Sequence, residues 1–151
     1  EVNINQSKYF LKKITNRFNK KNISNYTFAI WGLSYKPDTD DIRNSVSIGI
    51  IEKIIKLNGR VRVYDPKSLN NAKLYLKENN RITFCKNKYE AVKGADALIL
   101  LTEWLEFRSP EFNKVKSFLN NAVIFDGKNQ YDKLDMKKRG FEYYQIGVKP
   151  L

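Results

Sequence analysis

Short apolar runs alternate with helix-like segments along most of this 151-residue chain, and no other feature constrains its fold as strongly. Each run is five to seven residues long and ends near a glycine, a proline or a polar cluster, as buried strands do. The runs lie at residues 27–33, 81–85, 97–102 and 122–127, and a weaker one lies at 141–147; residues 60–66 alternate apolar with charged residues and also read as a strand, which Pro66 ends. Strands that alternate with helices in this way predict a parallel sheet covered by helices on both faces.

The segments between these runs carry helical signals. Residues 2–18 place Phe10, Leu11, Ile14 and Phe18 at three- and four-residue spacing. Further helices are expected at residues 45–59, 69–77, 89–96, 110–119 and 133–140, with Asn44 or Ser45 as a cap, Gly59 and Gly140 as stops and Pro110 in a first turn. The expected fold is α/β: a Rossmann-like, three-layer domain with a mainly parallel sheet of five or six strands. Right-handed crossovers bring the carboxyl ends of its strands to one edge, where ligands of such sheets bind.

The composition excludes several kinds of chemistry. The chain has no histidine, so a histidine metal site and a Ser-His triad are both excluded. A single cysteine, Cys85, rules out an internal disulfide and fits a reducing compartment. The apolar runs are much shorter than a membrane span, and no secretory signal is visible. Glu1, in place of an initiator methionine, indicates a fragment of a longer protein.

The net charge of +12 would suit a nucleic-acid or phosphate ligand. However, lysine supplies 21 of the 28 basic residues, the lysines are spread along the chain, and asparagine and isoleucine are also abundant. This pattern is typical of a proteome-wide compositional bias. We therefore expect no nucleic-acid partner and no membrane partner, and a basic nucleic-acid binder is kept as a rival interpretation.

The loop after the first run carries the strongest functional signal. It reads "IWGLSYKPDTDDIRNSVS", and its single glycine argues against a pyrophosphate-cradling turn. The proline that follows Lys36 holds this lysine in extended backbone, from which it can project a point charge into the ligand crevice. Arg43 stands at the entrance of the next helix, where an arginine can bind phosphate or carboxylate in a forked geometry. The alternative is that Arg43 pairs with Asp40 or Asp41 and pins the loop.

Taken with four later stretches, this loop resembles the C-terminal, UDP-binding domain of the UDP-glucose/GDP-mannose dehydrogenase family. That family has a strand, then G-L-x-[FY]-K-P-x-T-D-D-x-R-x-S, then a helix, and this chain reads "GLSYKPDTDDIRNS". The later stretches are "VYDP" at 63–66, "GADALILLTEW" at 94–104, "FDGKN" at 125–129 and "GFEYYQIG" at 140–147. "VNINQ" near the start resembles the end of the family's long central helix. The resemblance thus divides the chain into residues 1–24, the end of that linking helix, and residues 25–151, a UDP-sugar-binding domain.

The resemblance implies an activity for the full-length protein. Family members oxidise the C6 alcohol of a nucleotide sugar to a carboxylate with two NAD, as UDP-glucose 6-dehydrogenase does. By resemblance, Tyr35 and Lys36 contact the UDP-sugar substrate, and Arg43 reaches towards NAD, which a separate N-terminal domain mainly binds. Lys128 stands where many members have an arginine, so the charge is kept and the forked geometry is lost. The expected partners are the N-terminal and central domains of the same chain, and a second copy in a homodimer of the full-length enzyme.

Two parts of the family's chemistry have no counterpart in this chain. The family's nucleophile, a cysteine in a glycine-rich stretch, and the NAD-binding G-x-G-x-x-G are both absent. Cys85, at the end of the third predicted strand, reads as a half-buried structural thiol. We therefore expect no catalytic residue and no metal site here, and no oxidation by this chain alone. A stand-alone nucleotide-binding or interaction module without catalysis is the main alternative.

The resemblance further implies a cytoplasmic enzyme whose product feeds polysaccharide biosynthesis. Enzymes of UDP-glucose, UDP-N-acetylmannosamine, UDP-N-acetylgalactosamine and GDP-mannose share the loop, so the loop does not choose among these substrates. For Trp104 and Phe107, core or interface packing is preferred over a place at the crevice. Glu103 either orients a cation of the site or is solvated. Tyr143 and Tyr144 should point to opposite faces of the last strand, so at most one is expected in the core.

Overall fold

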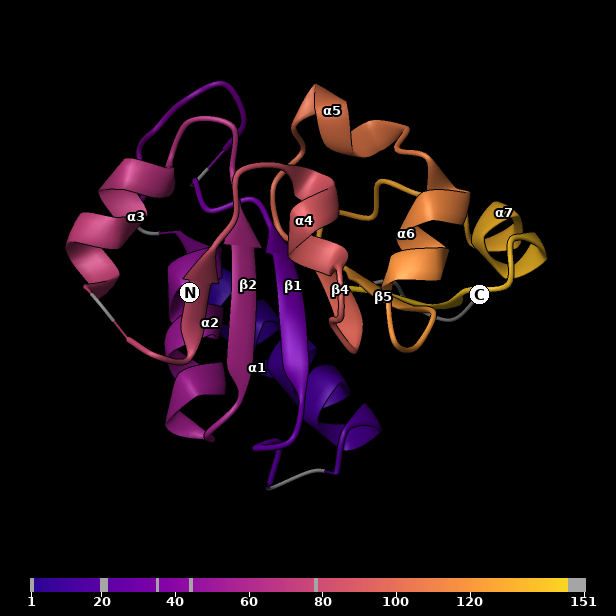
Figure 1. Cartoon of the computed structure of the whole chain (residues 1–151), viewed down its shortest axis with the longest axis horizontal. Helices are drawn as coiled ribbons and strands as arrows, with labels where there is room; N and C mark the ends of the chain where they lie inside the picture. The colour runs from indigo at the N-terminus through magenta and orange to yellow at the C-terminus, as the bar shows by residue number, and fades with distance from the viewer. Residues whose placement is uncertain (1, 20–21, 35, 44, 78, 147–151) are drawn as a thin grey trace.

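The structure is a computed structural model that describes residues 2–19, 22–34, 36–43, 45–77 and 79–146. These residues form a sheet in the order β3-β2-β1-β4-β5-β6, in which every neighbouring pair is parallel (Figure 1). The strands are β1 (Thr27–Trp31), β2 (Arg60–Tyr64), β3 (Ile82–Phe84), β4 (Ala97–Leu100), β5 (Val123–Asp126) and β6 (Glu142–Gln145). The predicted parallel α/β fold is confirmed. Its strand order reverses between β1 and β4, and ligands of such sheets bind at that switch point, beyond the carboxyl ends of the strands.

Helices cover both faces of the sheet. They are α1 (Val2–Arg17), α2 (Val46–Lys56), α3 (Leu69–Leu76), α4 (Lys88–Val92), α5 (Leu105–Arg108), α6 (Phe112–Phe118) and α7 (Lys133–Lys138). Residues of α1, α2 and α3 share one core cluster, and residues of α4 to α7 share the other. In Figure 1, α4 and α6 accordingly lie in front of the sheet, with α1 and α2 behind it. No helix in the described part of the chain is long and apolar enough to cross a membrane.

The central strand β1 needs apolar residues at consecutive positions, because successive side chains point to opposite faces and both faces are covered by helices. Phe28 and Ile30 pack with α1 and α2, whereas Ala29 and Trp31 pack with the helices of the opposite face. All four side chains are fully buried. Trp31 stacks on Phe107 of α5 at a ring distance of 5.1 Å, and its indole N–H donates to a backbone carbonyl of α4 at 2.9 Å. Burial on both faces explains the continuous apolar run.

Helix α1 is an integral part of the core. Phe10, Ile14 and Phe18 recur on one side of the helix, and all three are buried against the sheet. The Lys13 ammonium donates to a carbonyl of β6 at 2.7 Å, and Arg17 forms an ion pair with Glu142 of the same strand. Removal of α1 would therefore expose the part of this face of the sheet that α2 and α3 do not cover. The division of the chain after residue 24 stays a prediction about the longer protein.

Several helix ends differ from the sequence prediction; α4, for example, ends at Val92 rather than at residue 96. Asn58, with φ of +69°, takes the left-handed conformation expected of Gly59 at the end of α2. Gly59 instead packs closely against Ile54. A Cβ at residue 59 would lie only 2.7 Å from Ile54 Cγ2, so a larger side chain would not fit there. Pro110 precedes α6 rather than lying in its first turn, since Glu111 is the N-cap of that helix. The short helix α5 has no counterpart in the sequence prediction.

As expected, Tyr143 and Tyr144 point to opposite faces of β6, and neither lies among the buried core residues. Each is half-buried and packs against one of the two core clusters. Tyr144 stacks on Phe125 at a ring distance of 4.9 Å, whereas the Tyr143 hydroxyl donates to Asp126 at 2.6 Å. An edge strand covered by helices on both faces therefore buries both of its tyrosines in part.

Candidate functional site

The turn after β1 passes so close to β4 that only glycine fits at its first position. Gly32 has φ of +103°, and its N–H donates to Tyr64 O at 2.9 Å. A Cβ at this position would lie 2.4 Å from Thr102 Oγ1 and 2.7 Å from Thr102 N. Since Thr102 follows β4, this contact marks the switch point between β1 and β4. The predicted ligand edge is therefore the place where the chain is most tightly packed against itself.

A buried carboxylate, Asp65, takes up the backbone donors of this turn. Its Oδ2 accepts hydrogen bonds from Leu33 N at 2.8 Å and from Ser34 N at 3.3 Å. Its Oδ1 accepts from Lys67 N and Ser68 N, both at 2.8 Å. In a dinucleotide-binding turn, N–H groups at this place face the pyrophosphate. Here an internal acceptor already holds them, so the chain is not built to cradle a pyrophosphate with this backbone.

Ser34 links the turn to Lys36. Its Oγ donates to Lys36 O at 2.8 Å, and its own carbonyl accepts from Thr102 Oγ1 at 3.2 Å. The Ser45 hydroxyl caps α2, as predicted, and donates to Leu33 O at 2.7 Å. The two ends of the loop are thereby fastened together, and Lys36 lies on the loop with an exposed side chain. The lysine predicted to read an anionic ligand is therefore both accessible and located at the carboxyl edge.

Arg43 pairs with Asp41, which is one of the two alternatives raised by the sequence. Its Nε and a terminal nitrogen each lie 2.9 Å from an Asp41 carboxylate oxygen, and Arg43 N donates to Asp41 Oδ1. These bonds lower the pKa of Asp41 to about 2. The arginine side chain is nevertheless 86% exposed. It borders an open hollow of about 520 Å³, lined by Thr39, Asp40, Asp41, Ile42, Arg43 and Asn71. The guanidinium is thus held at one side and free to meet a ligand at the other.

Lys128 follows β5 on the same edge of the sheet. Asp126, which is fully buried, accepts hydrogen bonds from Lys128 N at 2.9 Å, Gln130 N at 2.7 Å and Tyr131 N at 3.0 Å. Lys128 borders a small cavity of about 60 Å³ between α1 and the ends of β4 and β5. Strand β4 separates β1 from β5, so the strands that carry Lys36 and Lys128 run about 10 Å apart.

The remaining predicted residues are placed as follows. Tyr35 and Asn44 lie outside the described residues, so the substrate contact expected of Tyr35 stays a prediction. Trp104 and Phe107 are buried in the core, which agrees with the preferred interpretation. Glu103 is exposed and, within the described residues, makes no hydrogen bond or ion pair with Lys36. The residues that organise the site, Asp65, Ser34, Thr102 and Asp126, are not among the predicted site residues. For Asp65 and Asp126 the signal in the sequence is an acid directly after or at the end of a strand; Ser34 and Thr102 carry no such signal.

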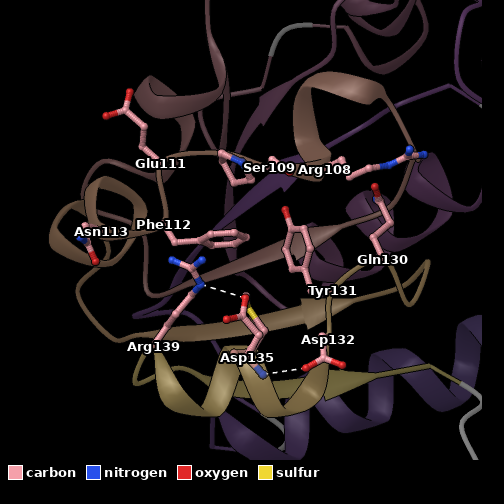
Figure 2. A pocket seen from close by; sticks show the side chains of 12 residues that line it. Arg108, Ser109, Glu111, Phe112, Asn113, Gln130, Tyr131, Asp132, Asp135 and Arg139 are labelled. Carbon is pink, nitrogen blue, oxygen red and sulfur yellow. Dashed lines mark hydrogen bonds and ion pairs between the residues drawn. The ribbon is translucent and has the colours of Figure 1, made fainter.

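A second hollow, of about 490 Å³, lies beside α7 and contains none of the predicted site residues (Figure 2). In this hollow Arg139 pairs with Asp135 at 2.9 Å and lies over the ring of Phe112 at 4.6 Å. Asp132 caps α7 by accepting from Asp135 N at 2.8 Å. Figure 2 shows these contacts lining the lower wall of the hollow. Arg139 and Asp135 pair with each other there, and no residue that the sequence predicts for ligand binding lines the hollow, so it offers a weaker case for a ligand than the edge that carries Lys36.

Cys85 is buried directly after β3, more deeply than the half-buried thiol expected from the sequence. Burial raises the pKa of this thiol to about 11. At pH 8 roughly one thiol in a thousand would therefore be ionised. We predict that iodoacetamide at pH 8 leaves the folded chain unmodified and alkylates Cys85 in urea, with mass spectrometry as the measurement. Equal labelling of the folded and unfolded chain would show that Cys85 is accessible.

The fold and this edge define an α/β domain of the Rossmann-like class. A family model described as UDP-glucose/GDP-mannose dehydrogenase family, UDP binding domain, matches residues 29–133, which is more than half of the chain. The chain belongs to this family and corresponds to its UDP-binding domain.

Individual relatives agree with this assignment. UDP-glucose 6-dehydrogenase of Pseudomonas aeruginosa is 39% identical over 124 residues, which cover 80% of this chain and 27% of that protein. UDP-glucose 6-dehydrogenase YwqF of Bacillus subtilis is 35% identical over 149 residues, which cover 99% of this chain and 33% of that protein. The solved structure of UDP-D-ManNAc dehydrogenase from Pyrococcus horikoshii matches with a TM-score of 0.69 and 27% identity, over 93% of this chain and 30% of that one. The chain thus spans about a third or less of the length of these relatives.

Proposed function

We propose that the chain is the substrate-binding domain of a nucleotide-sugar 6-dehydrogenase of the UDP-glucose 6-dehydrogenase type. The whole enzyme would oxidise the sugar C6 alcohol to a carboxylate with two NAD. The observation that carries this proposal is the position of Lys36. It is an exposed cation at the carboxyl edge of β1, on a turn whose backbone donors are bound by Asp65. Such a turn binds an anionic ligand through its side chains rather than through its backbone N–H groups.

In this proposal the chain binds and orients the substrate and contributes no group to bond cleavage. Lys36 forms a charge-assisted contact with the nucleotide sugar, Tyr35 contacts the same ligand, and Lys128 adds a second cation. The nucleophile and the redox step belong to parts of the enzyme outside these 151 residues. A cytoplasmic location, a homodimer and a role in polysaccharide biosynthesis are parts of the same proposal.

Among the described residues, we assign a contact to NAD only to Arg43. The β1 turn cannot cradle the pyrophosphate, because Tyr64 O accepts the N–H of Gly32 and Asp65 accepts the N–H groups of the next two residues. Arg43, however, presents an exposed guanidinium beside an open hollow. We propose that Arg43 adds one cationic contact to an NAD bound mainly by another domain. NAD supplies the hydride acceptor when it is bound, and Arg43 has a binding role only.

The test is a calorimetric titration of the chain with UDP. Lys36→Ala should weaken UDP binding by about 10- to 100-fold, since a charge-assisted hydrogen bond contributes roughly 1.5–3 kcal/mol. Lys56→Ala is the matched control, because Lys56 is also exposed but lies in the last turn of α2, towards the opposite edge of the sheet. The control should bind UDP as the unaltered chain does.

The rival interpretations predict other outcomes of the same titration. A basic nucleic-acid binder would lose affinity steeply with salt and discriminate little between nucleotides. A UDP-binding domain should prefer UDP to AMP at fixed salt. Equal loss of affinity in the Lys36 and Lys56 variants would refute a specific role for Lys36.

A further inference from the structure

Asp65 is the buried acid that joins the two loops nearest to the proposed nucleotide site. We infer that Asp65 is a positioning residue for that site: through Ser34, it fixes the backbone from which Lys36 projects. The inference rests on the proposed function, because Lys36 needs a defined position only if it reads a ligand. Asp65 itself is 1% exposed and does not need to touch that ligand.

The first step of the argument is the number of bonds that converge on Ser34. Its N–H is held by Asp65 after β2, and its carbonyl is held by Thr102 after β4. Its hydroxyl donates to Lys36 O. Ser34, Asp65 and Thr102 are all nearly inaccessible to solvent, with exposures of 2%, 1% and 0%. Three neighbouring strands therefore determine the position of a residue only two places before Lys36.

The second step is the chemistry of the acceptor. A carboxylate offers about four acceptor sites, and Asp65 receives four backbone N–H groups. An asparagine would keep one oxygen and turn an NH₂ group towards two donors, which cannot bond to it. The bonds to Lys67 and Ser68 are both 2.8 Å, whereas one of the two bonds to the β1 turn is 3.3 Å. Asp65→Asn should therefore release the β1 turn first.

The chain contains a matched control at the other end of the same strand. Asp96 Oδ2 accepts from Thr27 N at 2.8 Å, at the amino end of β1, and Asp96 Oδ1 accepts from the Asn120 side chain at 3.2 Å. Asp96→Asn makes the same chemical change at a residue that also holds β1. It lies at the edge of the sheet opposite to Lys36, so it should alter stability without altering nucleotide binding.

The experiment is a double-mutant cycle that combines Asp65→Asn with Lys36→Ala, with UDP affinity measured by calorimetry. Asp65→Asn should weaken UDP binding about 5- to 20-fold, and Asp96→Asn less than about twofold. In the Asp65→Asn background, Lys36→Ala should lower UDP affinity by less than about threefold. A displaced lysine contributes little to binding, so its removal changes the affinity little. A purely structural role for Asp65 would leave the effect of Lys36→Ala undiminished, and that result would overturn the inference.

Two further outcomes are distinguishable. If the unaltered chain does not bind UDP, the proposed function fails and the inference falls with it. If Asp65→Asn does not fold, Ser34→Ala takes its place in the cycle, because it removes the Ser34 Oγ bond to Lys36 O and leaves the bonds of Asp65 in place. Ser34→Ala should then weaken UDP binding and reduce the effect of Lys36→Ala. Full additivity of these two changes would count against the inference.

Discussion

Replacement of Gly32 by alanine should lower the free energy of unfolding by about 3–4 kcal/mol, which is a large share of the stability of a small domain. The added methyl group would lie 2.4 Å from Thr102 Oγ1 and 2.5 Å from Thr102 Cβ. Overpacking of this kind costs about 1–3 kcal/mol, and a strained backbone conformation adds about 1–3 kcal/mol. Gly32 has φ of +103°, so both costs apply. Urea unfolding followed by circular dichroism measures the loss.

The control for this prediction is Gly49→Ala. Gly49 lies within α2, and a Cβ added there meets no atom within 4 Å. Alanine should therefore stabilise the chain by about 0.5–1 kcal/mol, because glycine is unfavourable inside a helix. If Gly32→Ala were as stable as the unaltered chain, the close approach of the β1 turn to Thr102 would be incorrect.

Phe18→Ala should cost about 3–5 kcal/mol of stability, as truncations of buried phenylalanines do. Phe18 is 1% exposed at the end of α1, and its ring lies 5.2 Å from Phe28 and 5.0 Å from Tyr26. Edge-on contacts of this kind add to the loss of apolar burial. The measurement is the unfolding midpoint in urea, with the slope of the transition checked for a change.

Asn16→Ala tests whether the effect depends on the buried side of α1. Asn16 is exposed on the same helix, so its replacement should change stability by less than about 0.5 kcal/mol. A small effect of Phe18→Ala would mean that α1 is not part of the domain core. That outcome would favour a boundary at residue 24 that separates the helix physically from the sheet.

The order of strands and helices could be predicted because local patterns carry it. Apolar runs, caps and helical spacing are properties of neighbouring residues, and a run such as 97–100 is apolar throughout because β4 is covered on both faces. Helix α5 is only four residues long, which is too short for a periodic signal. The depth of Cys85 and the two half-buried tyrosines of β6 depend on packing between distant segments, so no local pattern reveals them.

The charged residues of the candidate site could be predicted from the sequence, but the buried residues that hold them in place could not. Lys36 could be placed at the ligand edge because it follows a strand and precedes a proline. The bonds from Asp65 to Leu33 and Ser34 could not be predicted, because they require β2 to lie beside β1 in a particular register. Arg43 had two aspartates within reach, and only the fold of the loop selects Asp41.

The bond between the Ser45 hydroxyl and Leu33 O joins residues that are 12 apart in the chain. This bond joins the two ends of the loop at residues 33–45, which carries Lys36 and Arg43, and so closes the loop into a ring. The entropy of a closed loop changes slowly with its length, by about 0.6 kcal/mol for each doubling. Residues can therefore be inserted between Lys36 and Arg43 at little entropic cost to the sheet beneath them. A lineage could in this way acquire new ligand preferences by drift within the loop while the domain remains folded.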